Sequence, residues 1–178
     1  MPRWGSHSRL QPDKMSRLSI ANLAAFQIVW FACVYSAAAG APWLGVAALA
    51  ASLALQFRTM DVKLFGAAAA LGLGGEWALH AVAVTGYPPQ AWTGEPIPAW
   101  MIALWVNFAS TLKASLAWLQ GRYVFATMAG AVAGPVSYWG GERLGAITLH
   151  PDPAVWIGGV GLLWALATPL LVWLSEAN

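Results

Sequence analysis

Long apolar runs, separated by short polar or Gly- and Pro-containing breaks, fill most of this chain of 178 residues. A helix needs roughly 17 to 25 apolar residues to cross a hydrocarbon core of about 30 Å. The pattern therefore predicts an all-α integral membrane protein, a compact bundle of six transmembrane helices. The predicted spans cover residues 18–39, 43–57, 64–85, 98–119, 123–139 and 154–174.

The breaks between the runs predict how the helices are joined. Residues 40–42 predict a tight hairpin between the first two spans, and the short second span can be accommodated by local thinning of the bilayer. The charged stretch 58–63 and the Pro- and Gly-rich stretch 86–96 predict loops. Residues 140–150 either continue the fifth span past a glycine hinge or form a short interfacial helix.

The fifth span carries its own packing signal. Gly130 and Gly134 have the spacing that lets two helix backbones approach closely. Pro135 follows, and because proline has no backbone donor it predicts a kink or an added partner at this point.

Basic residues are distributed unevenly along a chain in which only 9% of the residues are charged, against about 25% in soluble domains. The side predicted to hold both termini carries Arg3, Arg9, Lys14, Arg17, Arg58, Lys63 and Arg122. The opposite side carries Arg143. Because cytoplasmic loops are enriched in Lys and Arg, both termini are predicted to be cytoplasmic. Residues 1–17 then form a basic cytoplasmic tail, and residues 18–178 a single six-helix transmembrane domain.

The sequence gives little support for nucleic-acid binding or for a cleaved signal peptide. The net charge of +2 gives no reason to expect nucleic-acid binding, because four of the nine basic residues lie in the tail, where they serve orientation. The first run ends in small residues that a signal peptidase could cleave, but it is longer than the apolar part of a usual signal peptide.

The single cysteine, Cys33, excludes an internal disulfide. Its side chain is expected only to pack against its neighbours.

Glu76 and His80 are the first candidates for chemistry. With Ala68 and Gly72 they lie at four-residue spacing on one face of the third span. The small residues are toward its start and the ionisable ones toward its end. A carboxylate in the middle of a membrane span must be paired, hydrated or protonated. Glu76 and His80 are therefore the candidate catalytic residues, with a purely structural role as the alternative.

The fourth span is the most polar, with Asn107, Ser110, Thr111, Lys113 and Ser115. Lys113 can either extend its side chain to the headgroups or turn toward Glu76, and a Glu76 to Lys113 pair is one hypothesis. Asn107 and Lys113 are candidates for a polar cavity. The alternative for Asn107 and the hydroxyl residues is hydrogen bonds between helices.

In the fifth span a set of residues at four-residue spacing also shares one helix face: Ala126, Gly130, Gly134, Tyr138 and Glu142. Arg143 follows directly after it. If the small faces of the third and fifth spans meet, these side chains approach His80 and build a polar cavity that opens outward. The alternative is an interfacial charge pair. A metal site is not predicted, because the few ligands near His80 do not complete a shell. No cofactor motif is present either.

The fifth span and the residues after it carry a family resemblance. Gly134, Pro135, Ser137 and Tyr138 form a Gly-Pro-x-Ser-Tyr element, and residues 141–146 contain a Gly-x-x-Leu-Gly-Ala element. With these elements the chain resembles a family of small bacterial inner-membrane proteins of unknown function. The resemblance implies a compact multi-helix protein of the bacterial inner membrane, no established activity and, through gene neighbourhood, a link to fatty-acid modification.

Three functions are open on this evidence. The first is a polar site that handles a membrane lipid or another apolar small molecule, as an enzyme or as a binding protein. The second is a small proton-coupled transporter in which Glu76 carries the proton. The third is a structural subunit without its own activity. Membrane lipids are the expected partners, and a membrane partner protein or a second copy of the chain stays open.

Overall fold

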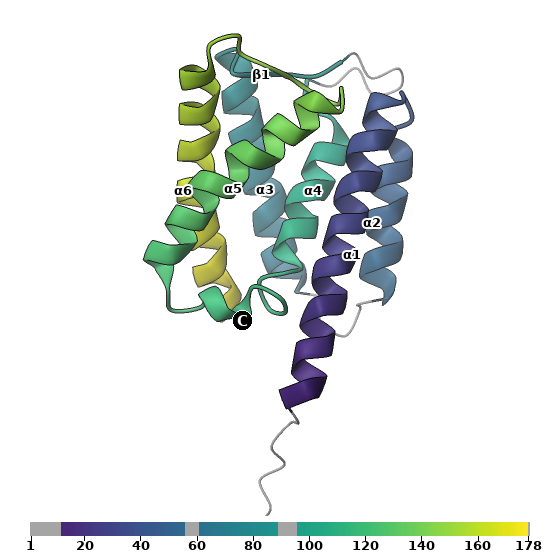
Figure 1. Ribbon diagram of the computed structural model, residues 1–178, viewed down its shortest axis with the longest axis vertical. Coiled ribbons are helices and arrows are strands. Elements are labelled where there is room, and N and C mark those ends of the chain that lie inside the picture. Colours follow the sequence, from purple (N-terminus) through teal and green to yellow (C-terminus); the bar gives the residue numbers. More distant parts are fainter. Residues whose placement is uncertain (1–11, 56–60, 89–95, 178) are drawn as a thin grey trace, which may run out of the picture.

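The computed structural model describes residues 12–55, 61–88 and 96–177, with side chains from Arg17 onward. Predictions for the first eleven residues and for parts of two loops lie outside this range. The described chain forms six α-helices (Figure 1): α1 Pro12–Ala38, α2 Trp43–Leu55, α3 Val62–Ala81, α4 Ala99–Ala109, α5 Tyr123–Arg143 and α6 Pro153–Glu176. The predicted helical bundle is thus confirmed.

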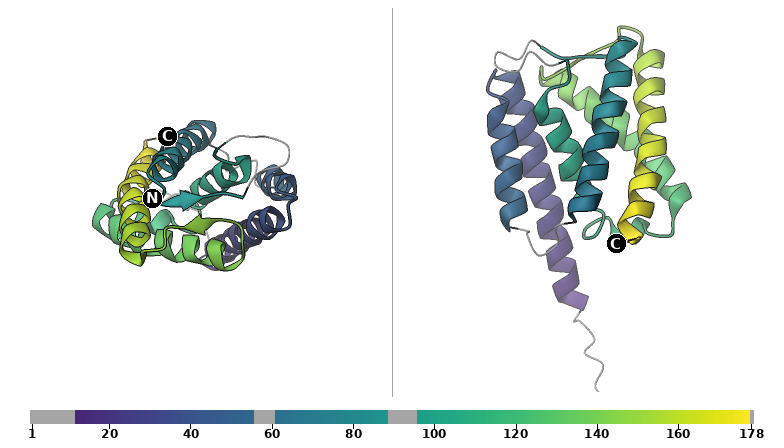
Figure 2. Two further views of the ribbon diagram at one scale, coloured as in Figure 1. Left: turned by 90° about the horizontal axis from the view of Figure 1, so that it is seen from above. Right: turned by 180° about the vertical axis from the view of Figure 1, so that it is seen from behind.

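The helices are arranged around α4, which lies in the middle when the bundle is viewed along its axis (Figure 2). From Met101 to Ala109 every residue of α4 is buried or half-buried. The neighbouring pairs are α5 with α6, α6 with α3, α3 with α4, α1 with α2, and α4 with both α1 and α2. The Pro12 end of α1 and the Glu176 end of α6 lie at the same end of the bundle (Figure 1).

The helix α1 begins at Pro12, inside the stretch predicted as a tail. Proline suits the first helical position because its fixed φ matches the helix and its missing donor has no partner there. The predicted hairpin follows: Gly40 has a φ of +74°, which favours glycine, and the chain turns into α2 at Trp43.

The helix α3 begins at the Asp61 N-cap, whose side chain accepts a hydrogen bond from the Leu64 amide. The residues predicted to share one face of this helix include Ala68, Gly72 and Glu76, and these three are buried. At Gly72 an added Cβ would lie 2.5 Å from the Trp105 ring, so this glycine brings α3 into close contact with α4.

The fourth helix is much shorter than predicted. It ends at Ala109, and residues 110–116 form turns before the short 3₁₀ helix η2, Ala117–Leu119. Ser110 Oγ donates to the Asn107 carbonyl at 2.7 Å, and Thr111 Oγ1 donates to the Phe108 carbonyl at 2.6 Å. Such side chains compete with the helical ladder, which gives a physical reason for the break.

The fifth helix runs unbroken past its glycines, so residues 140–143 continue it. Gly145 then ends the turn with a φ of +81°. Gly130 and Gly134 pack against α6, where an added Cβ would lie within 2.5 Å of Trp164 or Thr168 atoms. The predicted close approach is therefore made with α6, whereas Gly72 of α3 packs on Trp105 of α4. The hypothesis that the small faces of α3 and α5 meet was wrong.

A short antiparallel pair of strands, which the sequence pattern did not indicate, covers one end of the bundle. β1, Thr85–Gly86, pairs with β2, Thr148–Leu149. The strands lie at the end opposite the Pro12 end of α1 (Figure 1).

Large apolar side chains remain exposed on every described helix except α4. Examples are Ile28 at 67%, Trp77 at 59%, Val132 at 66% and Leu166 at 65%. Two helical segments, Arg17–Ala38 and Pro153–Glu176, are long and apolar enough to span a membrane. That all six helices cross it stays a prediction.

Candidate functional site

The Glu76 carboxylate is fully buried at the centre of a hydrogen-bond cluster. Trp105 Nε1 donates to Oε1 at 2.9 Å, and the Tyr87 hydroxyl donates to Oε2 at 2.7 Å. The Tyr138 hydroxyl also donates to Oε1. Because the three donors come from three separate parts of the chain, the cluster ties α3, α4, α5 and the stretch after β1 together.

His80 does not join this cluster by a direct hydrogen bond to Glu76. Its Nδ1 lies 3.2 Å from the Thr85 carbonyl oxygen of β1. Its ring lies beside Tyr87, with the ring centroids 6.1 Å apart. His80 therefore contacts Tyr87, one of the donors to Glu76.

A large apolar groove of about 490 Å³ lies next to the cluster. This volume falls within the range of about 300–1,000 Å³ that is usual for small-molecule sites. Residues of α1, α4, α5, α6 and the turn after α4 line it, and none of these side chains is charged. Trp105 and Tyr138 are among them, whereas Glu76 is not. The groove therefore reaches the partners of the carboxylate and leaves the carboxylate itself covered.

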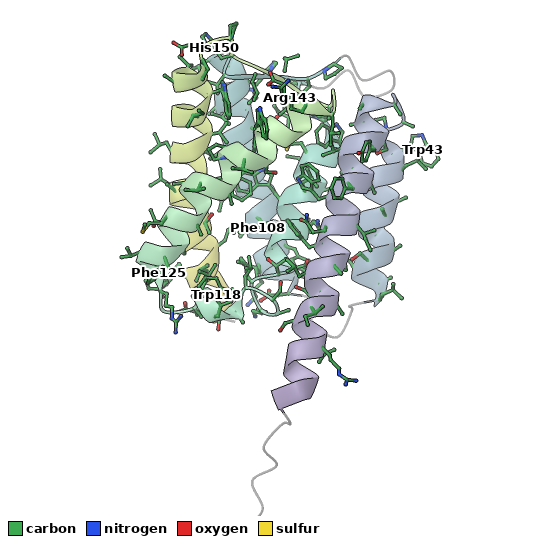
Figure 3. The ribbon with its side chains drawn as sticks, in the orientation of Figure 1. Trp43, Phe108, Trp118, Phe125, Arg143 and His150 are labelled. Carbon is green, nitrogen blue, oxygen red and sulfur yellow. The ribbon has the colours of Figure 1, made fainter. Side chains whose placement is uncertain are left out.

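Exposed residues at the rim show that the groove opens on the side of the bundle, between α1 and α5. Leu23 and Gln27 of α1 and Ala129 and Ala133 of α5 line it and are exposed. Phe108 lies between these two helices in the view of Figure 3. The opening therefore faces sideways, where a bilayer surrounds a membrane protein.

At one end the two rim helices come together. Trp30 Nε1 of α1 donates to Ser137 Oγ of α5 at 3.0 Å, and an added Cβ at Gly140 would lie 3.4 Å from the Trp30 ring. From there α5 slants away from α1 toward its start at Tyr123 (Figure 1). The groove is therefore closed at the strand end of the bundle and open toward the other end.

Lys113 is paired, but its partner is not Glu76. Its Nζ lies 2.6 Å from Asp61 Oδ2, at the start of α3. The hypothesis of a Glu76 to Lys113 pair was wrong, because the helix ends at Ala109 and the chain carries Lys113 to the end of the bundle. This hydrogen bond from the ammonium group lowers the pKa of Asp61 below its usual range.

Asn107 and its polar neighbours bind α1 and do not line a polar cavity. Asn107 Nδ2 donates to the Phe26 carbonyl at 3.0 Å. Asn22 Nδ2 donates to the Ser110 carbonyl, and Ser115 Oγ donates to Asn22 Oδ1. These bonds hold the irregular stretch after α4 against α1.

Glu142 and Arg143 lie at the strand end of α5. Glu142 Oε1 accepts a hydrogen bond from the Leu149 amide of β2 at 3.1 Å. The Arg143 guanidinium lies over the Trp139 ring at 5.6 Å. Of the five residues predicted for a polar cavity, the structure brings only Tyr138 to both Glu76 and the groove.

Trp105 and Tyr87 are the partners of Glu76 that sequence reasoning missed. Both sit in stretches where aromatic residues are common, and a donor to a buried carboxylate leaves no periodic signal. Within the described residues no group of three or more His, Cys, Asp or Glu side chains is placed to hold a metal ion. The site consists of a covered carboxylate next to an apolar groove.

These features define a class: an α-helical bundle with two helices that could span a membrane and with a side groove backed by a buried carboxylate cluster. The chain belongs to a family described as "Protein of unknown function (DUF2878)", whose model matches residues 19–170. No curated protein and no solved structure matches the chain. The expected membership of an uncharacterised family is confirmed, and its function must be argued from the site.

Proposed function

We propose that this protein is a six-span protein of the bacterial inner membrane, with both termini in the cytoplasm, that binds an apolar chain of a membrane lipid in the groove between α1 and α5. The observation that carries the proposal is the groove itself: about 490 Å³, free of charged lining side chains and open sideways between two helices.

The surface of the bundle supports the membrane location. Large apolar side chains are exposed on five helices, whereas soluble monomers rarely expose contiguous apolar patches of more than a few hundred Å². The excess of Lys and Arg on the side of the termini supports the cytoplasmic placement. In such an environment the molecules that reach a side groove are lipids.

Glu76 serves in this proposal as a positioning residue. Two of its three donors, Trp105 and Tyr138, form part of the groove wall, and neither can turn without breaking a bond to the carboxylate. The cluster therefore holds the back wall of the groove in one shape. His80 supports the same cluster through its contact with Tyr87.

Filling the groove tests the proposal. Ala129→Phe together with Ala133→Phe adds two rings at exposed positions one turn apart on the groove rim. Met128→Phe together with Val132→Phe is the matched control, because these residues are also exposed on α5 but do not line the groove. Native mass spectrometry of the detergent-purified protein measures the phospholipid that stays bound.

We expect the groove-filling pair to lower the lipid-bound fraction at least tenfold and the control pair to leave it unchanged. Thermal unfolding of both variants in the same detergent shows that each is folded. Equal lipid retention by the two folded variants would contradict lipid binding in the groove.

A further inference from the structure

The two ends of the groove differ, and the difference indicates which lipid enters it. At the strand end, the bond from Trp30 to Ser137 and the contact of Trp30 with Gly140 join the rim helices. A further close approach lies beyond them, where an added Cβ at Gly145 would be 4.0 Å from Ala38 Cβ. A lipid headgroup therefore has no way past this end.

At the other end the groove runs out to the surface. Trp118 and Leu119 of η2 line it there, and Trp118 is 54% exposed. Figure 3 shows Trp118 near the lower end of the bundle, the end that holds the last turn of α6. Tryptophan is enriched where the hydrocarbon meets the headgroups, so this end lies at headgroup depth.

The length of the groove fits one acyl chain. Its lining extends on α1 from Leu23 to Val34 and on α5 from Ala129 to Gly141. At 1.5 Å per residue each stretch is about 17 Å long. Half of a hydrocarbon core of about 30 Å is roughly 15 Å. The groove therefore matches the chain of a lipid from a single leaflet.

Charge then indicates the headgroup. Arg122, exposed, lies three residues after Leu119 and directly before α5, and Arg17, also exposed, lies at the same end of α1. The nearby carboxylate of Glu176 accepts hydrogen bonds from the Gly121 amide and the Tyr123 hydroxyl. Two exposed arginines therefore lie at the end of the bundle where the groove opens. Guanidinium groups bind phosphate in a bidentate manner.

Resting on the proposed function, we infer that the groove takes one acyl chain of an anionic phospholipid from the cytoplasmic leaflet. The phosphate of this lipid lies beside Arg122, and the end of its chain lies near Trp30. The lipid enters sideways between α1 and α5, where the two helices diverge.

Binding titrations followed by native mass spectrometry test the headgroup. The probes are dioleoyl phosphatidylglycerol, which is anionic, and dioleoyl phosphatidylcholine, which has the same chains and no net charge. Arg122→Gln should weaken binding of the anionic lipid about fivefold, the effect of roughly one basic residue near an anionic surface. Binding of the zwitterionic lipid should stay the same.

Lys63→Gln is the matched control, because Lys63 is exposed at the first turn of α3, a helix that contributes no residue to the groove lining. It should leave both affinities unchanged. Equal affinity of the wild type for the two lipids, or an equal loss from Lys63→Gln, would overturn the inference. If the Ala129→Phe and Ala133→Phe pair still blocks both lipids in that case, the proposed function stands without it.

A phosphatidylglycerol with a diazirine at the end of one chain tests the orientation. After irradiation and digestion, we expect adducts on the peptides that contain Trp30 to Val34 or Gly141 to Ile147. Adducts confined to the region of Trp118 would mean the opposite orientation and would overturn entry from the cytoplasmic leaflet.

Discussion

Tyr138 donates a hydrogen bond to the Glu76 carboxylate, and this bond joins α5 to α3. α5 packs along α6, whereas α3 packs against α4 and α6. Tyr138 also lines the groove. The bond therefore connects the groove wall to the buried centre of the bundle, and the first prediction follows from it.

Glu76→Gln should be tolerated, and Glu76→Leu should not. The glutamine oxygen can accept from Trp105 and Tyr138, while its amide donates to the Tyr87 hydroxyl, which can also act as an acceptor. Leucine removes the acceptor of two buried donors, Trp105 and Tyr138, at about 1–3 kcal/mol each, and of the half-buried Tyr87 hydroxyl. Unfolding in detergent should show a loss of at most ~1.5 kcal/mol for glutamine and at least ~3 kcal/mol for leucine.

Lipid binding adds a second readout for the same residue. A positioning role predicts that Glu76→Gln keeps its bound lipid. If this variant folds as the wild type does but loses lipid binding, the carboxylate contributes more than hydrogen bonds to the groove wall. That result would favour the hypothesis that Glu76 carries a proton.

Two glycines of α3 should respond to alanine with opposite signs. At Gly72 the new Cβ would lie 2.5 Å from the Trp105 ring, so Gly72→Ala should cost about 1–3 kcal/mol through overpacking. At Gly74 nothing lies within 4 Å, so Gly74→Ala should stabilise the helix by about 0.5–1 kcal/mol. Thermal unfolding measures both, and equal shifts for the two would contradict the close packing of α3 on Trp105.

The Asp61 to Lys113 pair predicts an acid-sensitive contribution to stability. Because the pKa of Asp61 is lower in the folded protein than its usual 3.8, the contribution is present above pH 3.8 and is lost as the pH falls toward the folded value. Asp61→Asn, which keeps the N-cap, should cost about 0.2–1 kcal/mol near neutral pH.

The difference between wild type and Asp61→Asn should shrink as the pH falls below about 4. Asp61→Ala serves as the control for the cap, because it removes the bond to the Leu64 amide as well and should cost about 1 kcal/mol more. A wild-type to Asp61→Asn difference that does not change with pH would show that the ion pair does not contribute.

Single cysteines test the orientation of the bundle in the membrane. In a Cys33→Ala background, Pro151→Cys and Ala177→Cys place thiols at exposed positions at opposite ends of α6. A membrane-impermeant maleimide should label the first in intact cells and the second only in inverted vesicles. The reverse pattern would place the termini outside and would contradict entry of a lipid from the cytoplasmic leaflet.

The sequence alone predicted the features that depend on local composition. Apolar runs specified six helices, and the four-residue spacing of Ala68, Gly72 and Glu76 specified the buried face of α3. The spacing of Gly130 and Gly134 indicated a close helix contact. Such features follow from the period of a helix and the size of side chains, so they can be read without knowing the partner.

Only the tertiary structure decided what these faces contact. In the structure α4 ends at Ala109, and Lys113 forms an ion pair with Asp61. Glu76 accepts hydrogen bonds from distant parts of the chain. A groove also remains between α1 and α5, because α5 packs on α6 and crosses the bundle obliquely. Helical periodicity specifies which side chains share a face, but the choice of the facing helix depends on long-range packing, which no local pattern encodes.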